Sequence, residues 1–138
     1  MKTSEINVLK RNGRGKEPLN IDKIHSMVGY ATEGITGVSA SHVEMNSGIQ
    51  FADGMSTDDI QQILIKSAND LISLENPNYQ YVAARLLLFS LRKKLYRRLW
   101  EHPKFIDQIK NCITQGVYDK DILTHYTESE IDRMGMWI

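Results

Sequence analysis

The sequence predicts a mainly α-helical protein with a small β element at its N-terminus, and three observations lead to this fold class. Apolar residues recur at helical spacing through most of the chain after Asp22. Before that point, Asn12-Gly13 follows a short apolar run, and this dipeptide is a strong signal for a hairpin turn. The length of 138 residues, without an internal repeat, suits one domain, or one small domain followed by the start of another.

The N-terminal β element is expected to be a hairpin. Its first strand runs from Val8 into a two-residue turn at Asn12-Gly13 and carries the cationic pair Lys10-Arg11 at its end, and the return strand is Glu17–Leu19. Type I′ turns require positive φ at both central positions, which asparagine and glycine adopt readily. The hairpin therefore carries two cations, Lys10 and Arg11, next to its turn.

Two helices are expected directly after the hairpin. The first extends from Asp22 to about Thr32, and either Asn20 or Asp22 is its cap. The second follows a cap at Ser41 and continues to about Ile49.

The next two helices are longer. Thr57 is the expected N-cap of the third, because Asp58-Asp59 then suit the positive end of the helix dipole. Its apolar face continues to Ile72, and Asn76–Asn78 ends it. The fourth helix extends from Tyr79 to about Trp100. Its broad apolar surface consists of Val82, Ala83, Leu86, Leu87, Phe89, Leu91 and Leu95.

His102-Pro103 is the expected domain boundary. Residues 1–100 then form one domain, and residues 101–138 begin a further helical segment. A fifth helix is expected from Phe105 until Gly116 stops it, and Thr127 starts a later one with acidic residues in its first turn.

Composition excludes several classes of protein. Seventeen basic residues balance 17 acidic ones, so no overall field favours nucleic acid or an anionic membrane. Cys112 is the single cysteine, which excludes an intrachain disulfide, and we expect it to be a buried structural thiol. The four histidines lack metal-ligand spacing, and no catalytic triad pattern is present. With no signal-peptide or membrane-spanning run, we expect a soluble, cytoplasmic chain without catalytic residues.

The N-terminal cations suggest an anion site. Lys10, Arg11 and Lys23 are expected to converge beside the start of the first helix. Backbone N–H groups and the helix dipole favour anions at such a place, and a polyphosphate suits several cations. From Lys10 and Arg11 alone, a solvated hairpin end is the simpler interpretation.

Four blocks of the sequence favour the binding interpretation: Val8–Gly13, Leu19–Ile24, Asp53–Ile60 and Tyr79–Leu86. In their order and spacing they resemble the ATP-cone, a nucleotide-sensing domain of ribonucleotide reductase large subunits. The resemblance implies a four-helix bundle capped by a β-hairpin or short mixed sheet and followed by extra helices. The segment after Phe105 is similar to the helical region that follows the cone in class I (aerobic) large subunits.

The resemblance implies a set of nucleotide-binding residues and no catalytic residue or protein metal site. The set is Lys10, Arg11, Glu17, Asn20, Lys23, Ile24, Thr57, Asp59, Gln61, Phe89 and Lys93. Four of these have structural alternatives. Thr57 and Asp59 are explained equally well by helix capping, Lys93 by a solvated cationic surface, and Phe89 fits a core position better than a stacking platform.

Two positions depart from the family pattern. Gln61 and Ser90 stand where cellular members are expected to have histidine. These positions lie where base and ribose would be distinguished, and one neutral hydrogen bond is worth only about 0.5–1.5 kcal/mol. We therefore expect ATP binding with a weakened response to dATP.

The resemblance implies an allosteric domain that binds ATP or dATP with Mg²⁺ and controls reduction of ribonucleoside diphosphates. Its implied partners are the remainder of the large subunit, a second large subunit and the small radical-generating subunit, with no membrane or nucleic acid. The alternative is a nucleotide-responsive DNA-binding regulator that contains a cone. Such regulators pair the cone with a zinc ribbon, which Cys112 alone cannot build.

Overall fold

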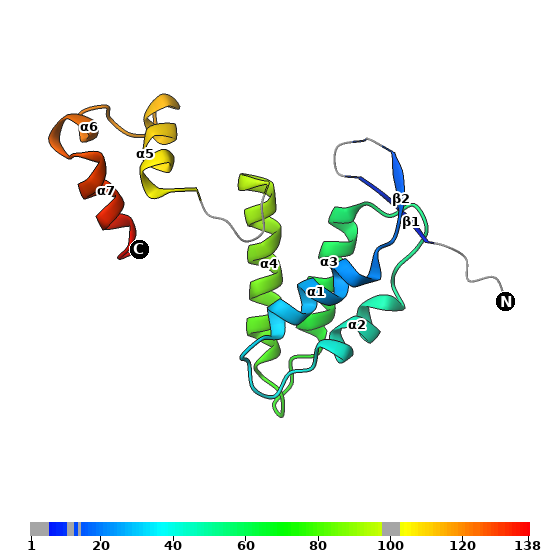
Figure 1. Ribbon diagram of the computed structural model, residues 1–138. Helices are drawn as coiled ribbons and strands as arrows, with labels where there is room; N and C mark the ends of the chain where they lie inside the picture. Colours follow the sequence, from blue (N-terminus) through cyan, green and yellow to red (C-terminus); the bar gives the residue numbers. More distant parts are fainter. Residues whose placement is uncertain (1–5, 11–12, 14, 98–102) are drawn as a thin grey trace. The chain divides into compact units, whose positions relative to one another are not determined.

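The structure is a computed structural model that describes residues 6–10, 13, 15–97 and 103–138 (Figure 1). The chain divides into two compact units, Met1–Leu95 and Tyr96–Ile138. In the described residues the first unit contains a two-stranded sheet and four helices, and the second contains three helices. The predicted fold class, mainly helical with a small N-terminal β element, is confirmed.

The N-terminal hairpin pairs β1 (Asn7–Leu9) with β2 (Lys16–Pro18) in antiparallel register, with Val8 opposite Glu17. A third segment extends this small sheet, because Leu9 also forms a parallel bridge with Ser56.

The predicted two-residue turn is wrong. The strands stop earlier than predicted, and the connection extends from Lys10 to Gly15. The Gly13 N–H donates to the Lys10 carbonyl at 3.0 Å, and the Lys10 N–H donates to the Gly15 carbonyl at 3.1 Å. Gly13 and Gly15 both have positive φ, so this sequence forms a longer loop. Asn12 and Arg14 lie outside the described residues.

Helix α1 (Ile21–Thr32) is capped by Asn20, whose side chain accepts from the Lys23 N–H at 3.0 Å. The sequence left Asn20 and Asp22 as alternatives, and Asp22 instead lies in the first turn. Helix α2 (Ala40–Gly48) begins before Ser41, so the predicted cap at Ser41 is wrong. Ser39 occupies the cap position there, without a side-chain bond.

Helix α3 (Thr57–Asp70) is capped by Ser56, so the predicted cap at Thr57 is wrong. Ser56 is in an extended conformation, with φ −78° and ψ 159°, because its bridge to Leu9 holds it in the sheet. Its Oγ accepts from the Asp59 N–H, and the Asp59 carboxylate accepts from the Ser56 N–H, which completes a capping box. The helix ends before Ile72, which is 40% exposed.

Helix α4 (Tyr79–Tyr96) begins as predicted but ends earlier. Arg97 has φ of +57°, which ends the helix, and Trp100 lies outside the described residues. The predicted broad apolar surface is also narrower than expected. The buried residues of α4 are Tyr79, Val82, Leu86, Phe89 and Ser90, whereas Leu87, Leu91 and Leu95 are exposed.

The bundle core is formed by side chains from all four helices. Its most completely buried members include Val28, Val43, Leu64, Val82 and Leu86. Figure 1 shows the hairpin at the end of the bundle where α1 and α3 begin and α4 ends. This arrangement brings three helix termini and the hairpin together.

The second unit packs α5 (Phe105–Thr114) against α7 (Glu128–Gly135), with the short α6 (Ile122–His125) between them in sequence. Gly116, with φ of +74°, follows α5 as predicted, and Thr127 caps α7. Cys112 is partly exposed, so its predicted burial is wrong. His102, half of the predicted boundary, lies outside the described residues.

Candidate functional site

A pocket lies where the hairpin, the first turns of α1 and α3, and the last turns of α4 meet. These elements all reach the pocket because their ends are held close together. Leu9 of β1 forms a bridge with Ser56 at the start of α3, and β2 is followed closely by Asn20, the cap of α1. The lining residues are Val8, Glu17, Leu19, Asn20, Lys23, Ile24, Met27, Thr57, Ile60, Gln61 and Lys93.

The lining separates into an apolar part and a charged part. Val8, Ile24 and Ile60 are buried, at 4, 7 and 6% exposure. The side chains of Lys23 and Lys93 are exposed, so these lysines form the charged rim. A ligand with an apolar part and a charged end matches this division.

Glu17 is an acidic group within the cationic rim. Its carboxylate lies 3.1 Å from Lys10 Nζ. The hydrogen bond from Lys10 lowers the Glu17 pKa from its ordinary value, and the charges of Lys10, Lys23 and Lys93 lower it further. Glu17 therefore acts as an internal counter-ion for lysines that an anionic ligand would contact.

The start of α1 adds to the positive potential of the pocket. Asn20 lines the pocket and caps this helix, and Lys23 lies in its first turn. The positive end of the α1 dipole and the Lys23 side chain therefore act in the same place. Such a place suits a phosphate group.

The structure brings seven of the eleven predicted residues into the pocket wall: Glu17, Asn20, Lys23, Ile24, Thr57, Gln61 and Lys93. Lys10 is not part of the wall but contacts it through Glu17. Arg11 lies outside the described residues.

The remaining two predicted residues have structural roles. Asp59 is absent from the lining, and its Oδ2 accepts from the Ser56 N–H at 3.0 Å and Oγ at 2.7 Å. These bonds from Ser56 lower the Asp59 pKa. Phe89 is 5% exposed and also absent from the lining, which fits its core interpretation.

Sequence reasoning missed four lining residues, Val8, Leu19, Met27 and Ile60. All are apolar, and single apolar residues carry no signal that separates a pocket wall from a core. Helical spacing gave a partial signal that Met27 and Ile60 line the pocket. Met27 lies one turn after Lys23 on the same helix face, and Ile60 lies nearly one turn after Thr57.

Gln61 differs from the other polar groups of the wall because it is only 8% exposed. Its Nε2 donates to the Leu86 carbonyl of α4 at 2.9 Å. Ser90, the second position that departs from the family pattern, is 3% exposed and does not line the pocket.

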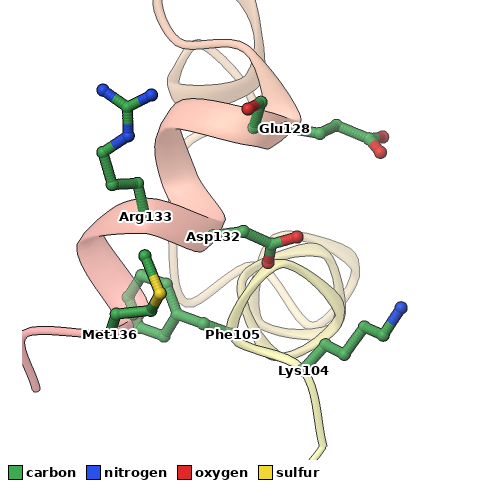
Figure 2. A pocket seen from close by; sticks show the side chains of 8 residues that line it. Lys104, Phe105, Glu128, Asp132, Arg133 and Met136 are labelled. Atoms are coloured by element: carbon green, nitrogen blue, oxygen red, sulfur yellow. The ribbon is translucent and has the colours of Figure 1, made fainter.

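A second hollow lies between α5 and α7 in the other unit (Figure 2). Met136 lies next to Phe105 there, and Asp132 points toward the start of α5. Asp132 Oδ1 accepts a hydrogen bond from the Ile106 N–H at 3.2 Å, so its carboxylate satisfies a backbone N–H in the first turn of α5. Cations and carboxylates are mixed in this wall, which gives no preference for one ligand charge.

The described residues contain neither a metal-binding cluster nor a membrane-spanning helix. No group of three or more His, Cys, Asp or Glu side chains in that part of the chain is arranged to hold a metal ion. No helix that the structure describes is both long and apolar enough to cross a membrane.

A helical bundle and a hairpin that meet at a lysine-rimmed pocket define a small domain with a site suited to an anionic ligand. The model of the ATP cone domain matches residues 6–94. The chain belongs to the ATP-cone family, and the resemblance inferred from the four sequence blocks is confirmed.

The chain is similar to the alpha subunits of several ribonucleoside-diphosphate reductases. The chain is 47% identical to ribonucleoside-diphosphate reductase 1 subunit alpha of Escherichia coli (strain K12) over 131 residues, 95% of this chain and 17% of that protein. It is 45% identical to the corresponding alpha subunit of Haemophilus influenzae, with the same coverage. It is 44% identical to that of Enterobacteria phage T4 over 126 residues, 91% of this chain and 16% of that protein. The chain thus spans less than a fifth of the length of these relatives.

Proposed function

We propose that this chain is the allosteric activity-control domain of a ribonucleotide reductase large subunit. The enzyme would convert ribonucleoside diphosphates to deoxyribonucleotides in the cytoplasm, and this domain would bind the effector nucleotide. Membership of the ATP-cone family and the names of the relatives support the assignment. The observation that carries it is the pocket, where two exposed lysines and the start of α1 face the same space.

The triphosphate would occupy the charged rim. Lys23 and Lys93 would contact phosphate oxygens directly, and Lys10 would turn from Glu17 toward the ligand. Arg11 would add a bidentate contact from the hairpin loop. Asn20 would keep the start of α1 in place, so that its dipole faces the phosphates.

The nucleoside would enter the apolar part of the pocket. Ile24 would pack against the base, and Thr57 and Gln61 would offer polar groups to base or ribose. Phe89 and Asp59 would act indirectly, since one supports the core behind the wall and the other holds the start of α3.

Mg²⁺ would accompany the triphosphate. Glu17 is a carboxylate at a rim where phosphates are proposed to bind, and like charges there repel unless a cation separates them. Mg²⁺ prefers carboxylate and phosphate oxygens, so the residues present fit a nucleotide-bound Mg²⁺ ion.

Effector binding would control the enzyme through subunit packing. The proposed partners are the remainder of the large subunit, a second large subunit and the small radical-generating subunit. Regulation requires that the nucleotide bind with different affinity in two assemblies, and such coupling is commonly about 1–3 kcal/mol.

Calorimetric titration with MgATP tests the binding site. We expect the 138-residue chain to bind ATP and the Lys93→Ala and Lys10→Ala variants to bind at least about tenfold more weakly, because each loses a charge-assisted phosphate contact worth about 1.5–3 kcal/mol. Lys94→Ala is the matched control, since Lys94 is the neighbouring cation and does not line the pocket.

Three results would count against this site. Absence of nucleotide binding by the unmodified chain would reject a working cone. Equal weakening by Lys94→Ala and Lys93→Ala would show that overall charge, rather than the pocket, attracts the ligand. An unchanged ATP affinity in the Lys93→Ala variant would show that α4 does not contribute to the nucleotide site.

The response to dATP tests the second part of the proposal. Because Gln61 and Ser90 replace the expected histidines, we expect dATP to inhibit the complete enzyme weakly or not at all. Activity assays of the reassembled enzyme at saturating ATP, with increasing dATP, measure this. Inhibition as strong as that of a histidine-containing relative would contradict the expectation.

A further inference from the structure

Helix α4 carries large apolar side chains on two opposite faces. One face is buried in the bundle core, through Tyr79, Val82, Leu86 and Phe89. The other face carries side chains that are 44 to 71% exposed, namely Tyr81, Leu87, Leu88, Leu91 and Leu95. Helices that are apolar on every side are normally buried on every side. The exposed face of α4 therefore has the character of an interface.

The exposed apolar residues of α4 form a continuous seam. Tyr81, Ala84, Leu88, Leu91 and Leu95 follow one another at alternating intervals of three and four residues, and all five are exposed. This is the spacing with which one helix packs lengthwise against another. At 1.5 Å per residue the seam is about 21 Å long, or about two heptads. We call these five residues the α4 seam.

Cations border the α4 seam on both sides. Because each residue turns the helix by about 100°, Arg92 lies beside Leu88 at one edge and Lys94 lies beside Leu87 at the other. Helix α4 contains no aspartate or glutamate between Tyr79 and Tyr96. The border of the seam therefore has a single sign of charge and favours an acidic partner.

Two other occupants match the α4 seam less well. A second copy of this chain would bring the same cationic border, so its α4 would supply no complementary charge. An anionic lipid surface is typically recognised by about four to eight clustered cations. Only Arg92 and Lys94 border the seam in this way, because the nearby Arg85 donates a hydrogen bond to the Glu33 carbonyl at 2.6 Å.

We propose that the α4 seam is the docking surface for an amphipathic helix of a partner protein, with apolar residues at heptad spacing and acidic residues on both flanks. The apolar side chains of that helix pack between those of the seam, and its carboxylates pair with Arg92 and Lys94. Lys93 lines the pocket from another side of α4, so this surface is separate from the proposed nucleotide site. Docking here needs no bound nucleotide.

Fluorescence anisotropy measures docking to the complete 138-residue chain. The probe is a labelled synthetic peptide of about three heptads, with leucine at the two seam positions of each heptad and glutamate at the flanking positions. Repulsion between these glutamates keeps the peptide from pairing with itself at neutral pH. We expect saturable binding, and a matched peptide with lysine in place of glutamate should bind at least about tenfold more weakly.

Substitutions in the seam test its contacts. Leu88→Gln and Leu91→Gln should each weaken binding of the acidic peptide at least about tenfold, because an amide replaces an apolar contact at the centre of the seam. Leu74→Gln is the matched control, since Leu74 is fully exposed in the α3–α4 connection, and it should leave binding unchanged. The double variant Arg92→Glu/Lys94→Glu should instead prefer the lysine peptide. Circular dichroism verifies that each variant is folded.

Four results would overturn the proposal. The first two are no binding of the acidic peptide and equal affinity for the acidic and lysine peptides. The third is dimerisation of the chain that Leu91→Gln abolishes, which would assign the seam to a second copy. The fourth is adsorption to phosphatidylserine vesicles that the same variant abolishes, which would assign the seam to a lipid surface.

Discussion

At the scale of single residues, Glu17 opposes anion binding in the pocket that Lys10, Lys23 and Lys93 make attractive to anions. The carboxylate neutralises part of this positive charge, as its lowered pKa indicates. A triphosphate must compete with Glu17 for Lys10, unless a divalent cation binds both groups. Glu17 therefore links nucleotide affinity to Mg²⁺.

Substitution of Glu17 tests this link. We expect Glu17→Gln to bind ATP about two- to fivefold more tightly without Mg²⁺, the range expected when an exposed ion pair no longer competes. With Mg²⁺ present the gain should shrink, because the cation loses a ligand. Calorimetry in EDTA and in Mg²⁺ measures both affinities.

Glu75→Gln is the control for this experiment, since Glu75 is exposed in the α3–α4 connection. Weaker binding by Glu17→Gln under both conditions would show that Glu17 holds the nucleotide directly.

At the scale of elements, the capping box of α3 is the feature that positions the pocket residues Thr57, Ile60 and Gln61. Ser56 belongs both to the bridge with β1 and to the cap of the helix. The start of α3 is consequently fixed relative to the hairpin. Loss of the cap would affect stability and site geometry together.

Acid unfolding tests the cap. The Ser56 hydrogen bonds lower the Asp59 pKa in the folded chain. Their contribution is therefore fully present above the ordinary aspartate pKa of about 3.9 and is lost as pH falls below it. Asp59→Asn should be less stable at pH 7, and its stability should change less between pH 4 and pH 2. Urea unfolding followed by circular dichroism at each pH measures this.

Ser56→Ala should reproduce the loss at pH 7, at about 1 kcal/mol for an N-cap. Ser41→Ala is its control, because Ser41 lies inside α2 and caps nothing. An acid dependence in Asp59→Asn identical to that of the unmodified chain would show that other carboxylates control acid unfolding.

At the scale of the whole molecule, the chain contains two units whose stabilities are separately testable. The second unit depends on close packing between α5 and α7, where a Cβ added at Gly135 would lie 2.5 Å from Phe105 Cβ. By contrast, a Cβ at Gly29 in α1 of the first unit would meet nothing within 4 Å.

Two alanine substitutions should therefore have opposite effects. Gly135→Ala should destabilise the second unit by about 1–3 kcal/mol, the cost of overpacking, without changing ATP affinity. Gly29→Ala should stabilise the first by about 0.5–1 kcal/mol, because alanine favours a helix over glycine. Hydrogen exchange resolved by unit, together with calorimetry, measures both effects. Reduced ATP affinity in Gly135→Ala would show that the second unit contributes to the site.

The sequence by itself determined the features that depend on near neighbours. Helical spacing predicted the helices, and Thr127 predicted the start of α7. Asn20 was one of two candidate caps of α1, and four sequence blocks indicated the family. Lys23 and Lys93 were recognisable as candidates because their charge and position matched the family pattern.

The tertiary structure decided what depends on contacts between distant residues. Ser56 and Thr57 are both good caps, and the bridge from Leu9 selects Ser56 by keeping it extended. Gln61 has an oriented amide only because Leu86, 25 residues away, offers it a carbonyl. Local preference cannot specify such pairings, since the energy that decides them comes from groups that only the folded chain brings together.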